Sequence, residues 1–360
     1  MADTAGKGDI CMADYYEAQL SRAAREAYGA MLRGFTAAET AVRVPLLDIR
    51  ELSEIYTRLR LDHPELFYLT GFHLRCMPGA EYGEIVPDYL FEKSKLQTHR
   101  QAIAARVQRL TREAAKGDET QKLLWLHDFI LENVRYDKLK KPYSNEVIGP
   151  LTQGVGVCEG IAKSVKLLAD ALGIPCLVAL SAPEEGQRYG HAWNLVKRGG
   201  KWVHLDATFD LSLSRCGEKR YDYCFLGDER LYRDHVRPVY PVPACTEEGS
   251  FYYKDVARIS LTKLEDVKKR TAQAVKKKKP RLIFHWRGGY LTKEALPAIC
   301  AAAEEAAQAA GKYARISLNW PQAVFCLSFT DEPPEGAPQL EQADEAAETA
   351  GESGEEPAAR

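Results

Sequence analysis

Three residues in one segment of the chain have side chains that could together carry out an attack on a carbonyl carbon. They are Cys158, His191 and Asp206, and they follow one another in that order. A thiolate attacks the carbonyl, an imidazole takes and returns the proton, and a carboxylate orients the imidazole. The chain has nine cysteines and eight histidines, so residue type alone does not select this set. The local structure predicted around each of the three residues does select it.

Cys158 lies in a glycine-rich stretch, GVGVCEG, that leads into a predicted helix. The helical pattern runs from Ile161 to Leu172, and Gly173 and Pro175 end it. Because the N–H groups of a first helical turn lack acceptors, they carry partial positive charge and stabilise a thiolate. The N–H of Cys158 is also a candidate oxyanion donor. The alternative interpretation is a small buried apolar residue, the usual role of a free cysteine.

A predicted hairpin around Gly199 and Gly200 brings the histidine and the aspartate together. If these glycines form a two-residue turn, Trp193 lies opposite Asp206. Residues two apart on a strand share a face, so His191 and Asp206 become diagonal neighbours. Their Cα atoms would lie roughly 7–8 Å apart or less, which allows an imidazole–carboxylate hydrogen bond. A register shift of one residue would place them on opposite faces.

Two neighbours on the same predicted face are candidates for supporting roles. Trp193 could shield the site from water, and His204 could be a residue beside the site or an alternative base. Each member of the set also has an ordinary structural interpretation. His191 would then be a core histidine bonded to the backbone, and Asp206 a turn or cap residue.

The elements around this set predict an α+β fold with four parts. Strands are expected at 191–197 and 201–209, and Asp118 with Gln121 predicts a capped helix start upstream. Towards the C-terminus a βαβαββ pattern indicates a small α/β domain. The expected parts are a helical and mixed N-terminal region (1–115), the domain carrying Cys158 (116–250), the small α/β domain (256–330) and an acidic disordered tail (331–360).

Composition excludes several classes of protein. Hydrophobic residues make up 45% and charged residues 28%, and no window is apolar enough for a membrane span or a secretory leader. The cysteines form no CxxC, which argues against a zinc site or a disulfide framework and favours a cytoplasmic protein with reduced thiols. Residues 331–360 carry a net charge of −9, so the rest carries +7. The run Lys276–Lys279 is better explained by a helix C-terminus than by nucleic acid.

The motifs as a set resemble the transglutaminase-like superfamily. The resemblance covers about residues 118–240 and rests on four segments, GVGVCEGIAKSVKLLADALGIPC, HAWNLV, KWVHLDATFD and YDYCFLGDE, with the pair Asp234-His235 after them. The segment DHPELFYL also resembles one that precedes this domain in bacterial members. The resemblance implies a papain-like fold in which Cys158 is the nucleophile, His191 the base and Asp206 the orienting acid.

The resemblance also indicates a further site residue and two departures. Papain-like enzymes use a nearby glutamine side chain for the oxyanion, which makes Gln153 the candidate second donor. The residue after Cys-Glu-Gly is often aromatic in the family and is Ile161 here, and the usual Thr-Trp is Thr208-Phe209. Both changes lie outside the three-residue set and could reshape the acyl pocket.

The sequence therefore predicts thiol-dependent acyl transfer on a peptide or glutamine side-chain carbonyl. No metal or organic cofactor is needed, and the expected partner is a protein or peptide substrate, without nucleic acid or membrane. Whether water or an amine completes the reaction stays open, as does the oligomeric state. The alternative is a non-catalytic module of the same fold that binds a protein or peptide.

Overall fold

The structure of the protein is a computed structural model that divides into two compact units. The first comprises Met1–Thr208 with Val236–Ala244, and the second Phe209–His235 with Cys245–Arg360. The residues that the structure describes are 14–139, 141–183, 190–214, 218–247, 251–288, 291–334, 336 and 338–341.

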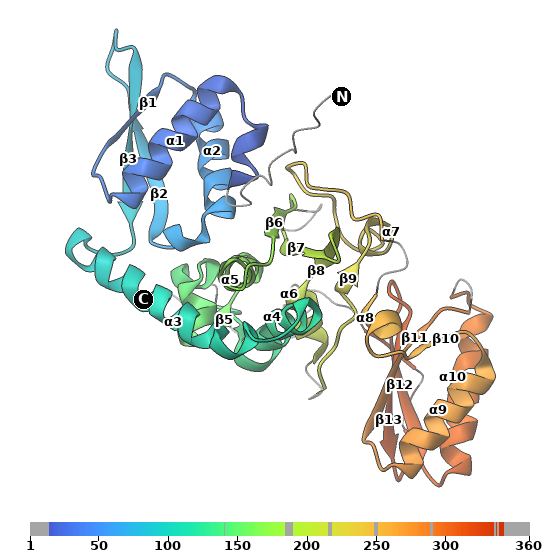
Figure 1. Cartoon of the computed structure of the whole chain (residues 1–360). Coiled ribbons are helices and arrows are strands. Elements are labelled where there is room, and N and C mark those ends of the chain that lie inside the picture. Colours follow the sequence, from blue (N-terminus) through green and yellow to red (C-terminus); the bar gives the residue numbers. More distant parts are fainter. Residues whose placement is uncertain are drawn as a thin grey trace, which may run out of the picture. The chain divides into compact units, whose positions relative to one another are not determined.

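The N-terminal part of the first unit combines two helices with a small antiparallel sheet (Figure 1). The strand order is β1-β3-β2, and the helices α1 and α2 lie against one another beside it. Its elements are α1 (Arg22–Thr36), β1 (Val42–Pro45), α2 (Ile49–Asp62), β2 (Leu69–Arg75) and β3 (Tyr82–Tyr89), preceded by a short turn, η2 (Glu17–Gln19).

Local chemistry determines where these elements begin. The helix α1 starts at Arg22, because the hydroxyl of Ser21 accepts from the N–H of Ala24 and caps the helix there. Pro87 lies within β3, but β1 pairs with β3 only as far as Ile85. The missing N–H of Pro87 therefore interrupts no ladder on the β1 side.

The rest of the first unit places helices against a second antiparallel sheet. Asp118 and Gln121 form the expected capping box at the start of α4. The helix α5 packs against β6 and β7, and the Asn194 amide donates to the carbonyls of Ala162 and Leu177 at 2.9 and 3.2 Å. The elements are α3 (Lys93–Ala114), α4 (Glu119–Asn133), β4 (Arg135–Tyr136), β5 (Val155–Gly156), α5 (Cys158–Ala171), β6 (Cys176–Leu180), β7 (Ala192–Arg198) and β8 (Lys201–Leu205).

The β7–β8 hairpin has the register that the sequence predicts. Arg198 pairs with Lys201, and the ladder continues to Asn194 opposite Leu205. The second strand, expected to run to residue 209, is shorter than predicted. It ends at Leu205 because a carboxylate oxygen of Asp206 accepts from the N–H of Thr208 at 2.9 Å and starts the helix α6 (Ala207–Leu213).

The second unit contains a five-stranded sheet with two helices packed on it. The strand order is β10-β11-β13-β12-β14, and the expected βαβαββ pattern is present from β10 to β13. The elements of this unit after α6 are β9 (Cys224–Leu226), α7 (Asp228–Leu231), α8 (Tyr252–Asp255), β10 (Ser260–Leu261), α9 (Leu264–Lys276), β11 (Arg281–Trp286), α10 (Ala295–Ala309), β12 (Tyr313–Asn319), β13 (Val324–Thr330) and β14 (Gln339–Glu341).

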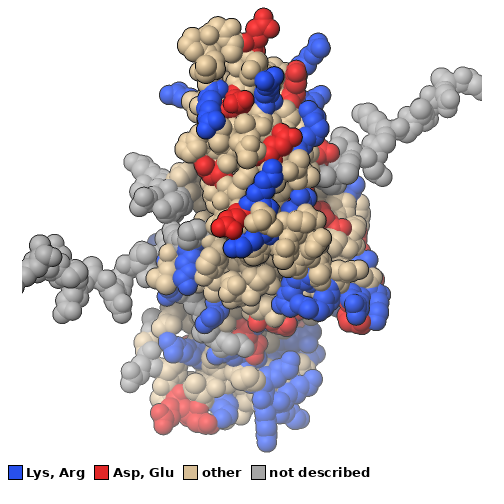
Figure 2. Space-filling view, turned by 90° about the vertical axis from the view of Figure 1, so that its left-hand side faces the viewer, with Lys and Arg blue, Asp and Glu red and all other residues tan. Residues whose placement is uncertain are grey.

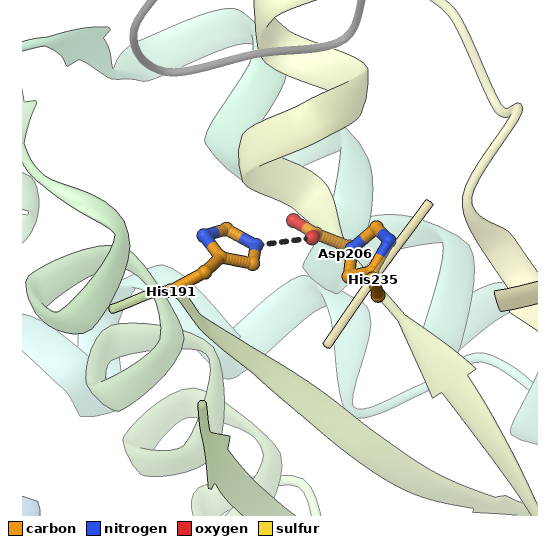
Figure 3. A group of neighbouring side chains, drawn as sticks. All are labelled: His191, Asp206 and His235. Atoms are coloured by element: carbon orange, nitrogen blue, oxygen red, sulfur yellow. Dashed lines mark hydrogen bonds and ion pairs between the residues drawn. The ribbon is translucent and has the colours of Figure 1, made fainter. Parts of the chain in front are cut away.

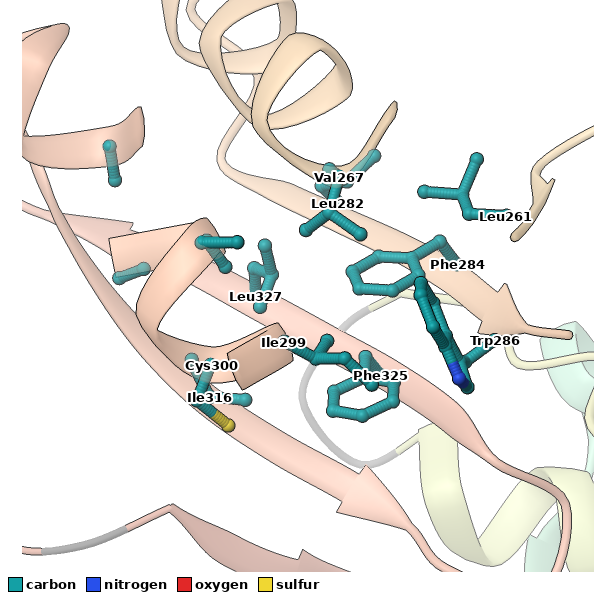
Figure 4. Close-up of a cluster of buried hydrophobic side chains, with 14 of the residues drawn as sticks. Leu261, Val267, Leu282, Phe284, Trp286, Ile299, Cys300, Ile316, Phe325 and Leu327 are labelled. Carbon is teal, nitrogen blue, oxygen red and sulfur yellow. The ribbon is translucent and has the colours of Figure 1, made fainter. Parts of the chain in front are cut away.

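The core of the second unit lies between this sheet and the helices α9 and α10. Figure 4 shows Phe284 of β11 and Phe325 of β13 beside Val267 and Ile299 from the helices. The two phenylalanine rings stack with centroids 5.1 Å apart. Burial of these aromatic rings stabilises the unit, since each removes a large apolar area from water.

Part of the acidic C-terminal segment is folded. Gln339–Glu341 forms β14 in parallel pairing with β12, and the Glu341 carboxylate lies 2.7 Å from Nη1 of Arg220. The disorder expected from residue 331 is therefore wrong for these three residues. The ion pair between Glu341 and Arg220 is largely buried, which explains why this acidic segment pairs with β12. Residues 342–360 lie outside the described residues.

The fold class predicted from the sequence is confirmed. The structure is α+β, with the cysteine-bearing helix α5 packed against the antiparallel strands that lead to His191 and Asp206. Within the described residues, no helix has both the length and the apolar composition needed to cross a bilayer. On the face seen in Figure 2, lysine and arginine side chains lie among aspartate and glutamate side chains.

Gly160 is required by a close approach of backbone at the start of α5. A Cβ at this position would lie against the carbonyl oxygen of Ser144, inside the 3.0 Å that real Cβ atoms keep. We therefore expect Gly160→Ala to lower the free energy of unfolding by roughly 1–3 kcal/mol, measured by urea denaturation. Gly29→Ala in α1 is the control, because its nearest new contact is the flexible end of Arg33 at 3.2 Å. An equal effect of both substitutions would contradict the close approach.

Candidate active site

Cys158 is the first residue of α5, as the sequence predicts. Val157 before it has an extended backbone and provides no side-chain cap, so no hydroxyl or carboxylate of the N-cap occupies the first turn. The Cys158 residue is 8% exposed. The thiol therefore lies at the positive end of a helix, in a largely water-excluded place.

The chain entering α5 is held by a compact loop. The N–H of Val157 donates to the Ser144 carbonyl and that of Asp137 to the Gly156 carbonyl, both at 3.0 Å. The Asp137 carboxylate accepts from the Ser144 hydroxyl and from the N–H groups of Lys141 and Leu139. Burial raises the pKa of Asp137, but these hydrogen bonds outweigh it and hold the pKa below its usual value. The ionised Asp137 carboxylate thus holds this loop together, and the loop fixes the position of Cys158.

His191 and Asp206 are in direct contact. Nε2 of His191 lies 2.6 Å from Oδ2 of Asp206, and Figure 3 shows the ring and the carboxylate facing each other. The Asp206 side chain is fully buried and the His191 side chain is 15% exposed. The backbone of His191 is pinned to Ser181, whose Oγ accepts from the His191 N–H at 3.1 Å and whose N–H donates to the His191 carbonyl at 2.8 Å. Both side chains are thereby held in one orientation.

Trp193 and His204 extend this contact into the core. The Trp193 ring stacks on the His191 ring, with centroids 5.7 Å apart and an interplanar angle of 13°. The indole Nε1 donates to Nδ1 of His204 at 3.1 Å. His204 is fully buried and its Nδ1 accepts this hydrogen bond, so that nitrogen carries no proton in this arrangement. His204 thus supports the indole of Trp193 through this contact.

Cys158 belongs to an apolar cluster that also includes the residue after His191. Cys158 packs in it with Ala162 of α5 and with Val178 of β6. Ala192, the residue after His191, belongs to the same cluster, as does Tyr16. The start of α5 and the start of β7 therefore lie side by side.

Gln153 is not brought into this group by any contact among the described residues. It ends the short helical turn η5 (Gly149–Gln153) and is exposed, and its amide lies 3.4 Å from the Thr152 hydroxyl. Ile161, where an aromatic residue is usual in the family, is buried in α5. The pair Asp234-His235 lies in the second unit, where the two side chains contact at 2.9 Å.

Sequence reasoning missed a buried ion network next to Cys158. Glu159 follows the cysteine, and its carboxylate lies 2.7 Å from the Lys163 ammonium. Glu146 contacts the same ammonium at 2.9 Å and also pairs with Arg60 from α2. Only the spacing of Glu159 and Lys163 was visible in the sequence as a helical pair. Arg60 and Glu146 are distant in the sequence, so no local sequence pattern indicated their contact.

The network has an unusual protonation balance. The Lys163 side chain is fully buried, and this burial, with the nearby positive charge of Arg60, lowers the pKa of Lys163 to about 7. Burial raises the pKa of Glu159, but Lys163 and Arg60 outweigh it and hold the pKa below its usual value. Two cations and two anions thus compensate one another around the first turn of α5 at neutral and lower pH.

The part of the chain that carries Cys158, His191 and Asp206 matches a known family model. A family model described as the transglutaminase-like superfamily matches residues 104–207. These residues form a transglutaminase-like core. The match includes Cys158, His191 and Asp206, and it confirms the resemblance seen in the sequence. No curated protein matches the chain.

Several solved structures are similar to this chain at low sequence identity. A TGase crystal structure is 14% identical, with 47% of this chain and 50% of that chain covered, at a TM-score of 0.26. A proposed cysteine protease from Cytophaga hutchinsonii is 16% identical, covering 38% of this chain and 61% of that one, at a TM-score of 0.26. A proposed protease from Parabacteroides distasonis is 15% identical, covering 38% and 36%, at a TM-score of 0.24. The chain therefore spans less than two thirds of each relative.

Glu146 tests the buried network of the transglutaminase-like core. We expect Glu146→Gln to lower the free energy of unfolding by roughly 3 kcal/mol, because it leaves Lys163 and Arg60 with one carboxylate between them. Urea denaturation at pH 6 measures the change. The matched control is Glu113→Gln, which breaks the exposed pair with Lys116 and should cost less than about 1 kcal/mol. Similar losses in both variants would mean that the network adds nothing beyond a surface pair.

Proposed function

We propose that the protein catalyses thiol-dependent acyl transfer on a peptide or glutamine side-chain carbonyl. Cys158 is the nucleophile, His191 the base and Asp206 the residue that orients the base. The 2.6 Å contact between the His191 imidazole and the buried Asp206 carboxylate carries the proposal. A buried carboxylate that orients a histidine, together with a cysteine at the start of a neighbouring helix, provides the groups that thiol activation needs.

The proposed reaction has two halves. Nδ1 of His191 takes the thiol proton, the Cys158 sulfur bonds to the carbonyl carbon, and the carbonyl oxygen becomes an oxyanion. The C–N bond then breaks, and His191 delivers the proton to the departing amine, which leaves a thioester. Water or a second amine attacks the thioester, and the thiol is released. When water attacks the thioester, the net reaction is hydrolysis. When an amine attacks it, the net reaction forms a new amide.

The assignment of the two ring nitrogens follows from the observed contact. Because Asp206 faces Nε2, the neutral imidazole carries its proton there and donates it to the carboxylate. Nδ1 is then the basic nitrogen that we assign to Cys158. The stack of Trp193 on the ring restricts its rotation, so the tautomer and the ring orientation are set together.

The oxyanion would form at the first turn of α5. The backbone N–H of Cys158 is one donor, since it lies where a helix supplies N–H groups without intrahelical acceptors. The contacts of Gln153 do not support it as the second donor. Removing one such donor typically costs roughly 2.7–4 kcal/mol in the barrier, so the second donor is worth identifying.

The proposed setting follows from the same chemistry. A protein or peptide is the proposed substrate, and the reaction requires no metal or organic cofactor. A reducing compartment such as the cytoplasm would keep the nucleophile as a thiol, and the free cysteines 76, 176, 300 and 326 are compatible with it. A non-catalytic binding module is the competing possibility, and the first experiment below separates the two.

Alkylation across pH tests the activated thiol. We expect iodoacetamide to modify Cys158 at pH 6 about tenfold faster than the exposed Cys76, because a stabilised thiolate persists at that pH. Burial raises the pKa of Cys300 and of Cys326 to about 11, so both should react slowly. Peptide mapping by mass spectrometry gives each rate. His191→Ala should remove the advantage of Cys158, whereas comparable rates at several cysteines would exclude a catalytic thiol.

A second experiment separates amine transfer from hydrolysis. The protein is incubated with a glutamine-containing peptide and a fluorescent primary amine, with Cys158→Ala as control. Attachment of the fluorophore indicates that an amine resolves the thioester, and ammonia release or peptide cleavage without attachment indicates water. Asp206→Asn should lower either rate by about 10⁴-fold, because the wrong tautomer of His191 is favoured. An unaffected rate in that variant would remove Asp206 from the site.

A further inference from the structure

An aromatic and apolar surface packs against the cluster that contains Cys158, and most of it comes from segments outside residues 104–207. Leu180 of β6 is joined in the Cys158 cluster by Tyr15, Tyr16, Tyr240 and Val242. We infer that this surface binds an aromatic or large aliphatic side chain of the peptide substrate, beside the carbonyl that Cys158 attacks. The inference rests on the proposed function and names the substrate class for the same site.

The N-terminal contribution is rigidly held. Tyr16 is buried, its hydroxyl donates to the Val178 carbonyl at 2.7 Å, and its N–H donates to the Asp62 carboxylate at 2.9 Å. Asp62 also accepts from the Tyr28 hydroxyl at 3.0 Å. The Tyr15 ring meets the Tyr16 ring edge to face, with centroids 5.3 Å apart. The Tyr15 ring therefore packs on a residue that is itself buried and held by hydrogen bonds.

The returning segment 236–244 supplies the other side of the surface. The N–H of Val239 donates to the Leu180 carbonyl at 2.8 Å, and the Gln19 amide donates to the Pro241 carbonyl at 3.0 Å. Tyr240 meets the Tyr16 ring at a centroid distance of 5.8 Å. The N-terminal turn and the returning segment are thus joined to each other and to β6 next to Cys158.

The chemistry of the exposed atoms identifies the occupant. Tyr15, Leu180, Tyr240 and Val242 are half-buried and pack against the cluster that contains Cys158, so each presents part of an apolar side chain to solvent. The guanidinium of Arg58 lies 4.4 Å from the centroid of the Tyr240 ring and 3.9 Å from the Glu54 carboxylate. This nearby cation therefore already has partners within the protein. Aromatic rings at an apolar surface favour another ring or aliphatic chain over a charged group.

A pair of alkylating reagents tests the surface. N-benzyliodoacetamide carries a phenyl ring next to the reactive group, and iodoacetamide carries none. We expect the rate ratio of the benzyl reagent to iodoacetamide to be at least about tenfold higher at Cys158 than at the exposed Cys76 of the same molecule. Cys76 corrects for the intrinsic reactivity of the two reagents. Equal ratios at the two cysteines would overturn the inference.

Variants locate the preference. Tyr240→Ala and Tyr15→Ala, taken from the two separate segments, should each reduce the ratio at Cys158 by about threefold or more, and Tyr240→Phe should retain it because the ring remains. Tyr82→Ala, in an exposed position on β3, is the matched control and should keep the ratio. Retention of the ratio in both alanine variants would place the preference elsewhere. Using two segments protects the test against a variant that does not fold.

The outcome also separates this inference from the proposed function. If Cys158 reacts no faster than Cys76 with iodoacetamide at pH 6, the proposed activated thiol fails. If Cys158 is activated but shows no preference for the benzyl reagent, only the aromatic surface fails, and the packing of Tyr15 and Tyr240 serves stability alone.

Discussion

The register of the β7–β8 hairpin determines whether His191 and Asp206 can meet. Gly199 and Gly200 both have positive φ, at 56° and 80°, which is the geometry of a two-residue turn that matches strand twist. With this turn, Arg198 pairs with Lys201 and the last pair is Asn194 with Leu205. His191 and Asp206 lie just beyond that last pair. A different turn would shift each side chain by one position and separate them.

The hairpin alone does not explain why the contact is short. Burial contributes, because a carboxylate without water needs strong hydrogen bonds. The Asp206 carboxylate accepts from the His191 ring and from the N–H of Thr208. The second bond also begins α6 and ends β8. One side chain therefore terminates the strand, starts the helix and orients the histidine, which is why the strand expected to reach residue 209 stops at Leu205.

The sequence was informative where structure is local. The capping box at Asp118, the helix start at Cys158 and the hairpin register all depend on residues close together in the chain, and all three are present. The acidic composition after residue 331 predicted disorder, yet β14 forms because Glu341 finds the buried Arg220. Composition describes a segment by itself and carries no information about a partner distant in the sequence.

The same limit explains the parts of the site that were missed. Tyr16 contacts the carbonyl of Val178, and Arg60 pairs with Glu146, so both depend on chain segments that only the folded structure brings together. Both contacts tie the N-terminal region to the transglutaminase-like core. A thiol site in this chain therefore depends on residues that precede its own domain in the sequence.

The ion network also restricts how Cys158 can be activated. Below a pH of about 7 the Lys163 cation is present, and Arg60 and Lys163 together face the two carboxylates of Glu146 and Glu159. The pKa of Lys163 is lowered to about 7, so this cation is lost as the pH rises and a net negative charge remains beside the thiol. That charge opposes a thiolate. Stabilisation of the proposed thiolate must then come from the N-terminus of α5, whose partial charge does not depend on pH, and from the imidazolium that His191 becomes when it takes the thiol proton.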